Sequence, residues 1–355
     1  MPNPSVKNFY ISSRKKRGEA NHMKCRALFF TGRRKVEIGE LECPKPGPNE
    51  VRIKTIACGI CTGDRYAFLG IHESKYPFPG GHEPVGEIES VGSNVTHFKP
   101  GDRVTAVPYV PYPWSLNPSF SEYTIASERN VAKVPGNADP CLWIGEPIAC
   151  IVNGVRYADV QPYDNVIVIG TGFMGLLLIQ GLSQTPLNTL IAIDLNDERL
   201  RLAKEFGANV CLNPNVHDVR KEINSITNGL GADIVVEAAG SNSALLLAAD
   251  LCRKQARLLI FGNHKGKRIL NLGIWHHKGL KVFNPSPWAS PDFAKDLQTA
   301  VNLMKKGVYK LDKLITHRGT LDEAQHIFEV AAVDYEPNEG LVSCKKGYIK
   351  GVITF

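Results

Sequence analysis

Three separated segments of the chain carry side chains that commonly bind transition metals. They are Cys58-Gly59-Ile60-Cys61, Gly81-His82-Glu83 and Gly145-Glu146-Pro147. A thiolate, an imidazole and a carboxylate from separate segments can hold a catalytic Zn²⁺ and leave one position open for a substrate. Cys61, His82 and Glu146 are therefore candidate ligands, although their spacing alone is not diagnostic of zinc.

The Cys58–Cys61 pair has two alternative interpretations. It could be half of a structural zinc site, but the other cysteines form no second pair at a comparable spacing. It could also be a redox pair, which usually opens a helix in a thioredoxin-like βαβ unit, and the surrounding pattern does not match that unit. A histidine that stands alone is more often structural than a metal ligand. For His82, the neighbouring candidate ligands favour a metal-binding role.

A glycine motif typical of dinucleotide binding lies in the middle of the chain. It consists of Gly170, Thr171, Gly172, Phe173, Met174 and Gly175. The first glycine permits a tight turn, the second lets the backbone approach a pyrophosphate, and the third allows a helix to pack closely on a strand. The motif follows the apolar run 166–169 and precedes the helix-compatible stretch 176–182, so it predicts a helix N-terminus that faces the pyrophosphate.

Asp194 extends this pattern, because it ends the next predicted strand 24 residues after the first glycine. A carboxylate at that point is expected to accept hydrogen bonds from the adenosine ribose hydroxyls. It would also repel the additional phosphate of NADP, so NAD is the predicted cofactor. The alternative is a glycine turn with a capping aspartate in some other α/β fold.

Two patterns of secondary structure are expected to position these residues. Residues 24–110 contain short β-rich runs bounded by Gly, Pro and Asn, which predicts an all-β module. After about residue 148, apolar runs alternate with helical stretches, and this alternation predicts a doubly wound parallel sheet. A later helix is expected over 321–332, with Thr320 as its N-cap and Glu323 at N3. Six runs are expected to form the parallel sheet: 165–170, 189–194, 209–212, 234–237, 257–262 and 280–283.

The net charge of +7 is concentrated at the N-terminus. Residues 1–35 carry ten Lys/Arg and one acidic residue, whereas the other 320 residues carry 32 basic and 34 acidic ones. The body of the protein therefore offers no basic face for nucleic acid. We expect residues 1–22 to be a disordered basic extension.

Composition excludes two further classes of protein. A hydrophobic content of 43% argues against intrinsic disorder as the main state. The sequence contains no apolar run of the roughly 18–20 residues that a membrane helix needs. Its nine cysteines occur without a secretory apolar segment, which favours thiols or metal ligands in a reducing compartment and hence a cytoplasmic location.

Taken together, the motifs resemble those of the zinc-dependent medium-chain dehydrogenase/reductases, which include alcohol, sorbitol, glucose and threonine dehydrogenases. The resemblance covers about residues 23–355 and implies an α/β protein with two domains. A GroES-like β domain would be built from residues 23–147 and 288–355, with a Rossmann NAD-binding domain of residues 148–287 inserted between them. The matching segments are Gly59–Asp64, Gly81–Glu83, Phe98–Val104, Glu146–Ala149, Gly170–Gly175, Leu314–His317 and Lys350–Ile353.

The resemblance places Cys61, His82 and Glu146 at the positions of the catalytic zinc ligands. A glutamate as the third ligand is similar to the polyol and sugar branch of the family, since the alcohol branch usually has cysteine there. Glu83 follows the histidine as in the family and would ligate zinc in some states. Asp64 matches an acid that orients a ligand.

Two basic residues match positions close to the cofactor. Arg199 would lie near the adenosine and Lys350 near the pyrophosphate. The alternative for both is an ordinary solvated charge.

Three departures from the family pattern are informative. Family members with a structural zinc carry four cysteines in the lobe that corresponds to residues 106–120, and this sequence has none there, so one zinc per chain is expected. The usual Ser or Thr of the proton relay is replaced by Gly63, and the frequent relay histidine is replaced by Tyr66. Thr62, Tyr66 or ordered water could take over the relay. An aromatic residue that lines the pocket is an equal alternative for Tyr66.

The predicted function is a zinc-dependent transfer of hydride between NAD and a secondary alcohol of a polyol, cyclitol, sugar or amino sugar. The metal would lower the pKa of the substrate hydroxyl, and the nicotinamide would accept the hydride. Two alternatives are a non-catalytic NAD-binding sensor or structural protein, and a zinc-free enzyme similar to quinone reductases. We expect a homodimer or homotetramer with a small-molecule substrate, and neither nucleic acid nor membrane as a partner.

Overall fold

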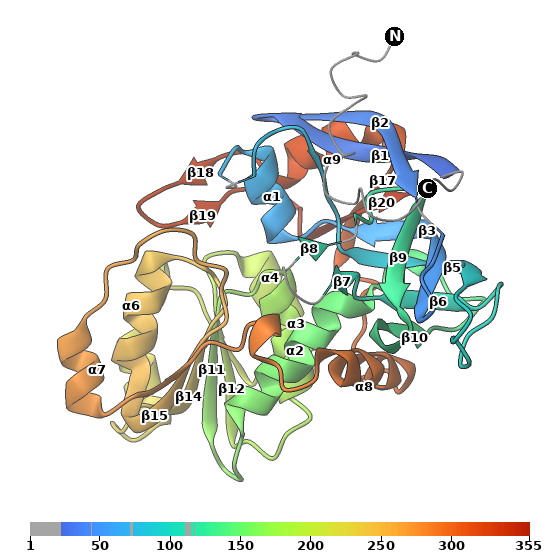
Figure 1. Ribbon diagram of the computed structural model, residues 1–355. Coiled ribbons are helices and arrows are strands. Elements are labelled where there is room, and N and C mark those ends of the chain that lie inside the picture. Colours follow the sequence, from blue (N-terminus) through green and yellow to red (C-terminus); the bar gives the residue numbers. More distant parts are fainter. Residues whose placement is uncertain (1–22, 44, 72–73, 111–114, 117) are drawn as a thin grey trace.

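The computed structural model describes residues 23–355 except 44, 72–73, 111–114 and 117 (Figure 1). The expected basic extension at residues 1–22 lies outside the described residues, as does part of segment 106–120, which corresponds to the structural-zinc lobe of the family. Beside that part, the backbone forms the short strands β7 (Tyr109–Val110) and β8 (Ser115–Leu116). Among the helices of the described residues, none is long and apolar enough to cross a membrane.

One large sheet joins strands from both ends of the chain, in the order β10-β6-β5-β3-β20-β17, with β9 also paired to β3. In Figure 1 the C-terminal strands lie beside strands of the N-terminal half. The pairing of β3 with both β5 and β20 brings together three segments that are far apart in sequence. The strands are β3 (Glu50–Gly59), β5 (Glu83–Val91), β6 (Arg103–Ala106), β9 (Tyr123–Ser127), β10 (Val131–Lys133), β17 (Ile315–Thr320) and β20 (Lys350–Thr354).

A smaller sheet and two helices cover this β domain. The sheet has the order β2-β1-β4. Ahead of α9, Thr320 and Glu323 form the predicted reciprocal capping box, although the first turn that follows is a 3₁₀ helix, Leu321–Glu323. The elements are β1 (Met23–Gly32), β2 (Lys35–Cys43), β4 (Phe78–Pro79), α1 (Thr62–Phe68) and α9 (Ala324–Ala331). A short hairpin, β18 (Tyr335–Glu336) and β19 (Leu341–Val342), follows α9.

The middle of the chain forms the expected six-stranded parallel sheet, in the order β13-β12-β11-β14-β15-β16. This order reverses direction between β11 and β14, which is where ligands bind in open α/β sheets, outside the carboxyl ends of the strands. All six predicted strands are present; β15 begins five residues earlier than predicted. They are β11 (Asn165–Ile169), β12 (Thr189–Ile193), β13 (Val210–Leu212), β14 (Ala232–Glu237), β15 (Cys252–Ile260) and β16 (Lys281–Phe283).

Helices pack on both faces of this sheet, and alternate residues of its strands point into two hydrophobic clusters. Val166 and Val168 belong to one cluster, whereas Ile167 and Ile169 belong to the other. Burial on both faces explains why the strands are continuous apolar runs in the sequence. The helices are α2 (Gly145–Ala158), α3 (Phe173–Leu182), α4 (Asp197–Glu205), α5 (Val219–Ile226), α6 (Asn242–Leu251), α7 (Leu272–Lys278) and α8 (Phe293–Lys305).

The first large cluster also joins the two halves of the molecule. Val85 of β5 and Val352 of β20 belong to it, together with residues of α2, α3 and α8. Helix α2 contacts both α8 and α3, so it lies at the junction. The two-part β domain agrees with the expected organisation, and the boundaries at 147/148 and 287/288 stay predictions.

Candidate active site

The metal-ligand candidates meet where β3 ends and β5 begins. Ligand atoms of Cys61, His82 and Glu83 lie within 4.8 Å of one another. Burial alone would lower the pKa of His82, but its hydrogen-bonded neighbour Cys61 and the carboxylates of Asp64 and Glu146 raise that pKa well above its usual value. Sulfur, nitrogen and oxygen donors at this separation fit Zn²⁺.

Asp64 holds Cys61 in place from the first turn of α1. Cys61 is the N-cap of this helix, and its backbone N–H donates to Oδ2 of Asp64 at 2.8 Å. Burial raises the pKa of Asp64, whereas His82 and the bond from Cys61 act in the opposite direction. Asp64 therefore fixes the backbone of Cys61, and its predicted part in orienting a zinc ligand stays a prediction.

Glu83 and Lys350 form a buried ion pair beside this cluster. Nζ of Lys350 lies 2.6 Å from Oε2 and 2.8 Å from Oε1 of Glu83, and the two side chains are 5% and 2% exposed. The strand register produces this contact, since Gly59 pairs with Glu83 and with Val352. A Cβ on Gly59 would lie 2.0 Å from Oε2 of Glu83, so glycine is required there.

Lys350 also connects the metal cluster to the dinucleotide loop. Its ammonium group lies 4.6 Å from the centre of the Phe173 ring, and Phe173 is the first residue of α3. The predicted position of Lys350 is close to the pyrophosphate. This contact places Lys350 beside the loop, but as a buried partner of Glu83 and not as a solvated charge.

Glu146 approaches the cluster from the first turn of α2. The side chain is buried, and its Oε1 accepts a weak hydrogen bond from Sγ of Cys150 at 3.7 Å. Burial, followed by the charge of Glu146, raises the pKa of Cys150 well above its usual value, so this thiol stays protonated and donates. The 4.8 Å cluster contains Glu83 and not Glu146, so Glu146 as the third zinc ligand stays a prediction.

The glycine loop has the shape that a dinucleotide requires. Gly170 has a φ of +92°, and a Cβ there would lie 2.6 Å from the backbone nitrogen of Ala239. A Cβ on Gly175 would lie 1.8 Å from the carbonyl oxygen of Gly170. Gly172 is the N-cap of α3 without a side-chain cap, and a Cβ there would meet no described atom within 4 Å. The N-terminus of α3 therefore fits a pyrophosphate.

Asp194 follows β12 and faces this loop. Its Oδ2 accepts a hydrogen bond from the backbone N–H of Thr171 at 2.6 Å, and its Oδ1 accepts one from Asn196 at 2.9 Å. Each carboxylate oxygen can accept more than one hydrogen bond. The remaining acceptor capacity fits a ribose with two hydroxyl groups.

Arg199 lies on α4 and reaches the C-terminal segment of the chain. Its guanidinium donates to the carbonyl oxygen of Tyr348 at 3.1 Å and lies 3.7 Å from Sγ of Cys344. Arg199 therefore joins the nucleotide-binding part to the segment that leads into β20. Its predicted place near the adenosine remains untested.

The other candidates lie at the starts of two helices. Thr62 begins α1, Met174 is the second residue of α3, and both are half-buried. A Cβ on Gly63 would meet no described atom within 4 Å, so the position has room for a side chain or for water. The functions predicted for Thr62 and Met174 remain predictions.

Tyr66 bridges three parts of the structure through its hydroxyl. The side chain is 2% exposed, and the hydroxyl lies 2.9 Å from the carbonyl oxygen of Asn263 and 3.2 Å from that of Gly340. Asn263 follows β15, and Gly340 lies in the turn between β18 and β19. Burial raises the pKa of Tyr66 to about 12, so the hydroxyl keeps its proton at neutral pH. It donates that proton in hydrogen bonds to the two carbonyl oxygens.

We therefore expect Tyr66→Phe to lower kcat by less than about tenfold, not by the ~100-fold of a lost acid–base group. Removing the hydroxyl leaves two buried carbonyl groups with one partner fewer, which should cost about 1 kcal/mol of folding free energy. Steady-state kinetics and the thermal unfolding midpoint measure the two effects. A ~100-fold lower kcat of Tyr66→Phe with unchanged zinc content would instead support Tyr66 as a member of the proton relay.

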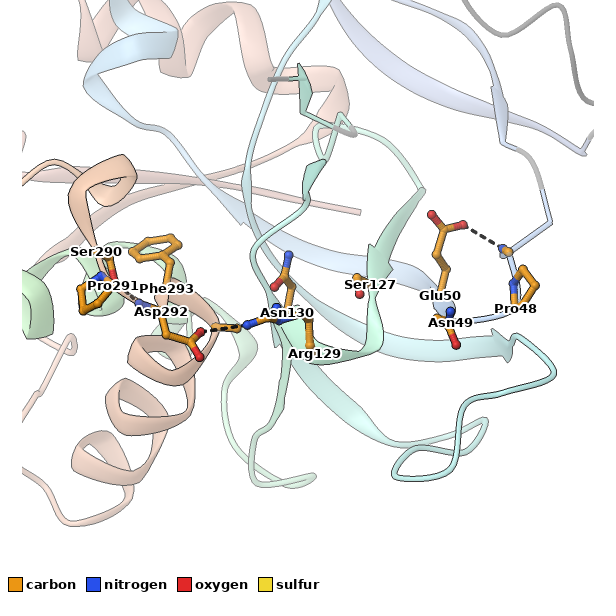
Figure 2. Close-up of a pocket in the computed structure, with 12 residues that line it drawn as sticks. Pro48, Asn49, Glu50, Ser127, Arg129, Asn130, Ser290, Pro291, Asp292 and Phe293 are labelled. Carbon is orange, nitrogen blue, oxygen red and sulfur yellow. Dashed lines mark hydrogen bonds and ion pairs between the residues drawn. The ribbon is translucent and has the colours of Figure 1, made fainter. Parts of the chain in front are cut away.

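A surface pocket of about 560 Å³ lies apart from these residues. Figure 2 shows it between the segments 47–50, 127–130 and 290–294, and none of the predicted site residues lines it. An ion pair of 3.1 Å between Arg129 and Asp292 crosses this region. We assign the pocket no part in the site described above.

Sequence reasoning missed two buried pairs of side chains. One is Glu83 with Lys350. The other is Glu237 with His264, whose Oε2 and Nε2 atoms lie 2.8 Å apart. Glu237 is a charged residue at the end of an otherwise apolar predicted strand, and this pattern in the sequence could have indicated it. Nothing local in the sequence indicates the partner in either pair.

The fold and the site together define an oxidoreductase that combines a dinucleotide-binding sheet with a β domain carrying candidate metal ligands. Two family models match the chain: "Zinc-binding dehydrogenase" over residues 174–306 and "Alcohol dehydrogenase GroES-like domain" over residues 47–136. Starvation-sensing protein RspB of Escherichia coli K12 is 31% identical over 320 residues, covering 83% of this chain and 91% of that protein. The chain belongs to the zinc-dependent medium-chain dehydrogenase family, as the resemblance predicted.

Two solved structures share the whole architecture. RspB from E. coli CFT073, in complex with NADH, is 25% identical with a TM-score of 0.79, covering 94% of this chain and 99% of that chain. Galactitol-1-phosphate dehydrogenase from E. coli is also 25% identical with a TM-score of 0.79, covering 93% and 100%. The predicted combination of a GroES-like β domain and a Rossmann domain is thereby confirmed.

Proposed function

We propose that this protein is a zinc- and NAD-dependent dehydrogenase that interconverts a secondary alcohol and a ketone on a polyol, cyclitol, sugar or amino sugar. The observation that carries the proposal is the cluster of Cys61, His82 and Glu83, which Lys350 links to the dinucleotide loop. The relative that acts on galactitol-1-phosphate supports the polyol class.

Bound zinc would lower the pKa of a substrate hydroxyl, and bound NAD would accept the hydride. The protein's own residues position both groups. Cys61, His82 and Glu146 would hold the metal, while Asp64 fixes the backbone of Cys61. Lys350 neutralises Glu83, so that this second carboxylate does not add an uncompensated charge beside the metal.

The cofactor would lie across the carboxyl ends of β11 and β14. The N-terminus of α3 would receive the pyrophosphate, and Asp194 the adenosine ribose. Tyr66, with its hydroxyl held by two carbonyl groups, would form part of the pocket wall.

The direct test is a substrate panel with NAD, read as absorbance of the reduced cofactor, together with zinc analysis of the same preparation. The panel contains polyols, cyclitols, amino sugars and a phosphorylated polyol, with ethanol as the small-alcohol control. We expect activity on at least one compound with a secondary hydroxyl, and one zinc per chain. A metal-free preparation that is fully active would favour the zinc-free alternative, and tight NAD binding without turnover would favour a sensor or structural protein.

For Asp194→Ser we expect the preference for NAD over NADP to narrow or reverse. Placing a phosphate against the native carboxylate should cost on the order of several kcal/mol, and serine removes that repulsion. The measurement is kcat/KM with each cofactor, and the matched control is Glu198→Gln, a charge on the exposed side of α4. A native enzyme with the higher kcat/KM for NADP would contradict the assignment of Asp194.

A homodimer or homotetramer is part of the proposal. β16 is the last strand of the six-stranded sheet, and its outer edge could pair with the same strand of a second copy. Light scattering coupled to size-exclusion chromatography measures the assembly.

A further inference from the structure

A β-hairpin near the C-terminus reaches from the β domain to the nucleotide-binding part. It consists of β18 and β19, and residues 337–340 form its turn. The base of the hairpin is fixed to α1, because the guanidinium of Arg65 donates to the carbonyl oxygen of Val342 at 2.6 Å. The rings of Tyr66 and Tyr335 also pack edge to face, with their centres 6.0 Å apart. The hairpin is therefore held at its base by the β domain.

The turn of this hairpin bonds to the first residues of α6. Oε2 of Glu339 accepts the backbone N–H of Ser243 at 2.9 Å, and the backbone carbonyl oxygen of Glu339 accepts that of Asn242, also at 2.9 Å. N–H groups in the first turn of a helix have no partner within the helix. The bond from the backbone of Ser243 holds the pKa of Glu339 below its usual value, so the carboxylate is ionised at neutral pH. Glu339 therefore attaches the turn to the nucleotide-binding part.

The turn also covers the loop that follows β15. The carbonyl oxygen of Gly340 lies 3.2 Å from the hydroxyl of Tyr66, and a Cβ on Gly340 would overlap the guanidinium of Arg268. Nε and Nη2 of Arg268 are buried and donate to no group of the described residues. Burying a charged donor without a partner is costly. Lifting the turn would expose the guanidinium to water, so the covered arrangement depends on the bonds that hold the turn down.

The same C-terminal segment is tied to the nucleotide-binding part at a second point. Arg199 of α4 donates to the carbonyl oxygen of Tyr348 at 3.1 Å. Helix α4 follows β12 and α6 follows β14, and these two strands flank β11 in the sheet. Because β11 leads into the glycine loop, the two ties lie on either side of the place where a dinucleotide is expected. Two residues after Tyr348, Lys350 contacts Phe173 of that loop.

We propose that segment 334–348 is a strap that retains the bound dinucleotide, and that Glu339 anchors this strap. The inference rests on the proposed function, which places the cofactor across the carboxyl ends of β11 and β14. A cofactor held between two parts of a protein leaves when those parts separate or when the segment over it lifts. Either movement breaks the bonds between Glu339 and α6, so these bonds slow the release of the cofactor.

Glu339 is a positioning residue, because it acts through the place of the turn and not on the reacting atoms. Helix α6 has its own N-cap, Ser241, whose hydroxyl oxygen accepts the backbone N–H of Ala244 at 3.1 Å. The helix therefore keeps a cap when Glu339 is replaced. Glu339 is also only half-buried, so its replacement should leave the fold and the zinc content unchanged.

The test compares Glu339→Ala and Glu339→Gln with the native protein. Glutamine keeps a side-chain carbonyl oxygen that can accept the N–H of Ser243, whereas alanine has no acceptor. The matched control is Glu336→Ala, which removes an exposed acidic side chain from β18 of the same hairpin. Each protein is loaded with NADH and mixed with excess NAD, and the change in NADH fluorescence gives the rate constant of release. Zinc content and the thermal unfolding midpoint are measured on the same preparations.

We expect Glu339→Ala to release NADH roughly tenfold faster, the effect of losing a hydrogen bond to a charged group. Glu339→Gln should restore most of the native rate, and Glu336→Ala should match the native protein, while zinc content stays the same in all of them. Equal release rates for the native protein and Glu339→Ala overturn the proposal. An equally large effect of Glu336→Ala also overturns it, because the lost charge would then explain both. A native protein that binds no NADH is instead a failure of the proposed function.

Discussion

Cys61→Ala should remove both zinc and activity while the fold remains intact. The thiolate is one of the donors within the 4.8 Å cluster, and losing it leaves too few ligands for a stable catalytic site. Metal stabilisation of developing charge is worth several kcal/mol, so the rate should fall by roughly 10³-fold or more. Metal analysis, steady-state kinetics and circular dichroism are the measurements.

The fold should survive because the parallel sheet has a hydrophobic cluster on each face, and Cys61 belongs to neither cluster. Alternate residues of β11, β12 and β14 are buried in these two clusters. Cys211→Ala, a partly buried thiol on β13, is the matched control and should keep full zinc and activity. Retention of one zinc per chain and normal turnover by Cys61→Ala would refute the assignment.

Lys350→Met should destabilise the protein strongly. The substitution removes the charge but keeps most of the side-chain volume, and it leaves the carboxylate of Glu83 buried without its partner. Breaking a buried ion pair from one side costs about 3–5 kcal/mol. Urea unfolding followed by fluorescence measures the change in the free energy of unfolding.

The double variant Glu83→Gln with Lys350→Met should recover much of that loss, because no unpaired charge remains. The change in the free energy of unfolding of the double variant is compared with the sum of the changes in the two single variants. The difference is the coupling energy between the two side chains. Lys24→Met is the matched control, since Lys24 pairs with Glu40 at 3.0 Å but both side chains are exposed, and its loss should cost 0 to about 1 kcal/mol. Equal effects for Lys350→Met and Lys24→Met would contradict the buried-pair interpretation.

The contribution of the Glu83–Lys350 pair to the free energy of unfolding should be constant over the neutral pH range. Burial by itself lowers the pKa of Lys350, but Glu83 and Cys61 outweigh it and raise that pKa above its usual value. A raised pKa in the folded state means that the stabilisation is complete below the unfolded-state value of about 10.5 and is lost as pH rises through the folded-state value. The native enzyme and Lys350→Met should therefore differ by the same amount at pH 6 and pH 8.

Local sequence patterns determined much of this protein. Within the strand–turn–helix unit, Gly170 has a φ of +92°, and a Cβ on Gly175 would meet the carbonyl oxygen of Gly170. The strands of the parallel sheet are apolar runs because both faces are covered. The reciprocal cap of Thr320 and Glu323 spans three residues and was also predicted. Cys61 and His82 could be named as candidate ligands because they stand in short motifs that resemble those of the family.

Only the tertiary structure decided which buried charges meet. Glu83 and Lys350 are 267 residues apart, and Glu237 and His264 are 27 apart. These contacts depend on the register of β5 and β20 against β3 and on the path of the loop after β15, which a local periodicity does not encode. The hydroxyl of Tyr66 shows the same limit: the sequence determined that an aromatic donor follows Cys61, whereas the packing of a loop and a hairpin around it decided that its proton is held by two carbonyl groups.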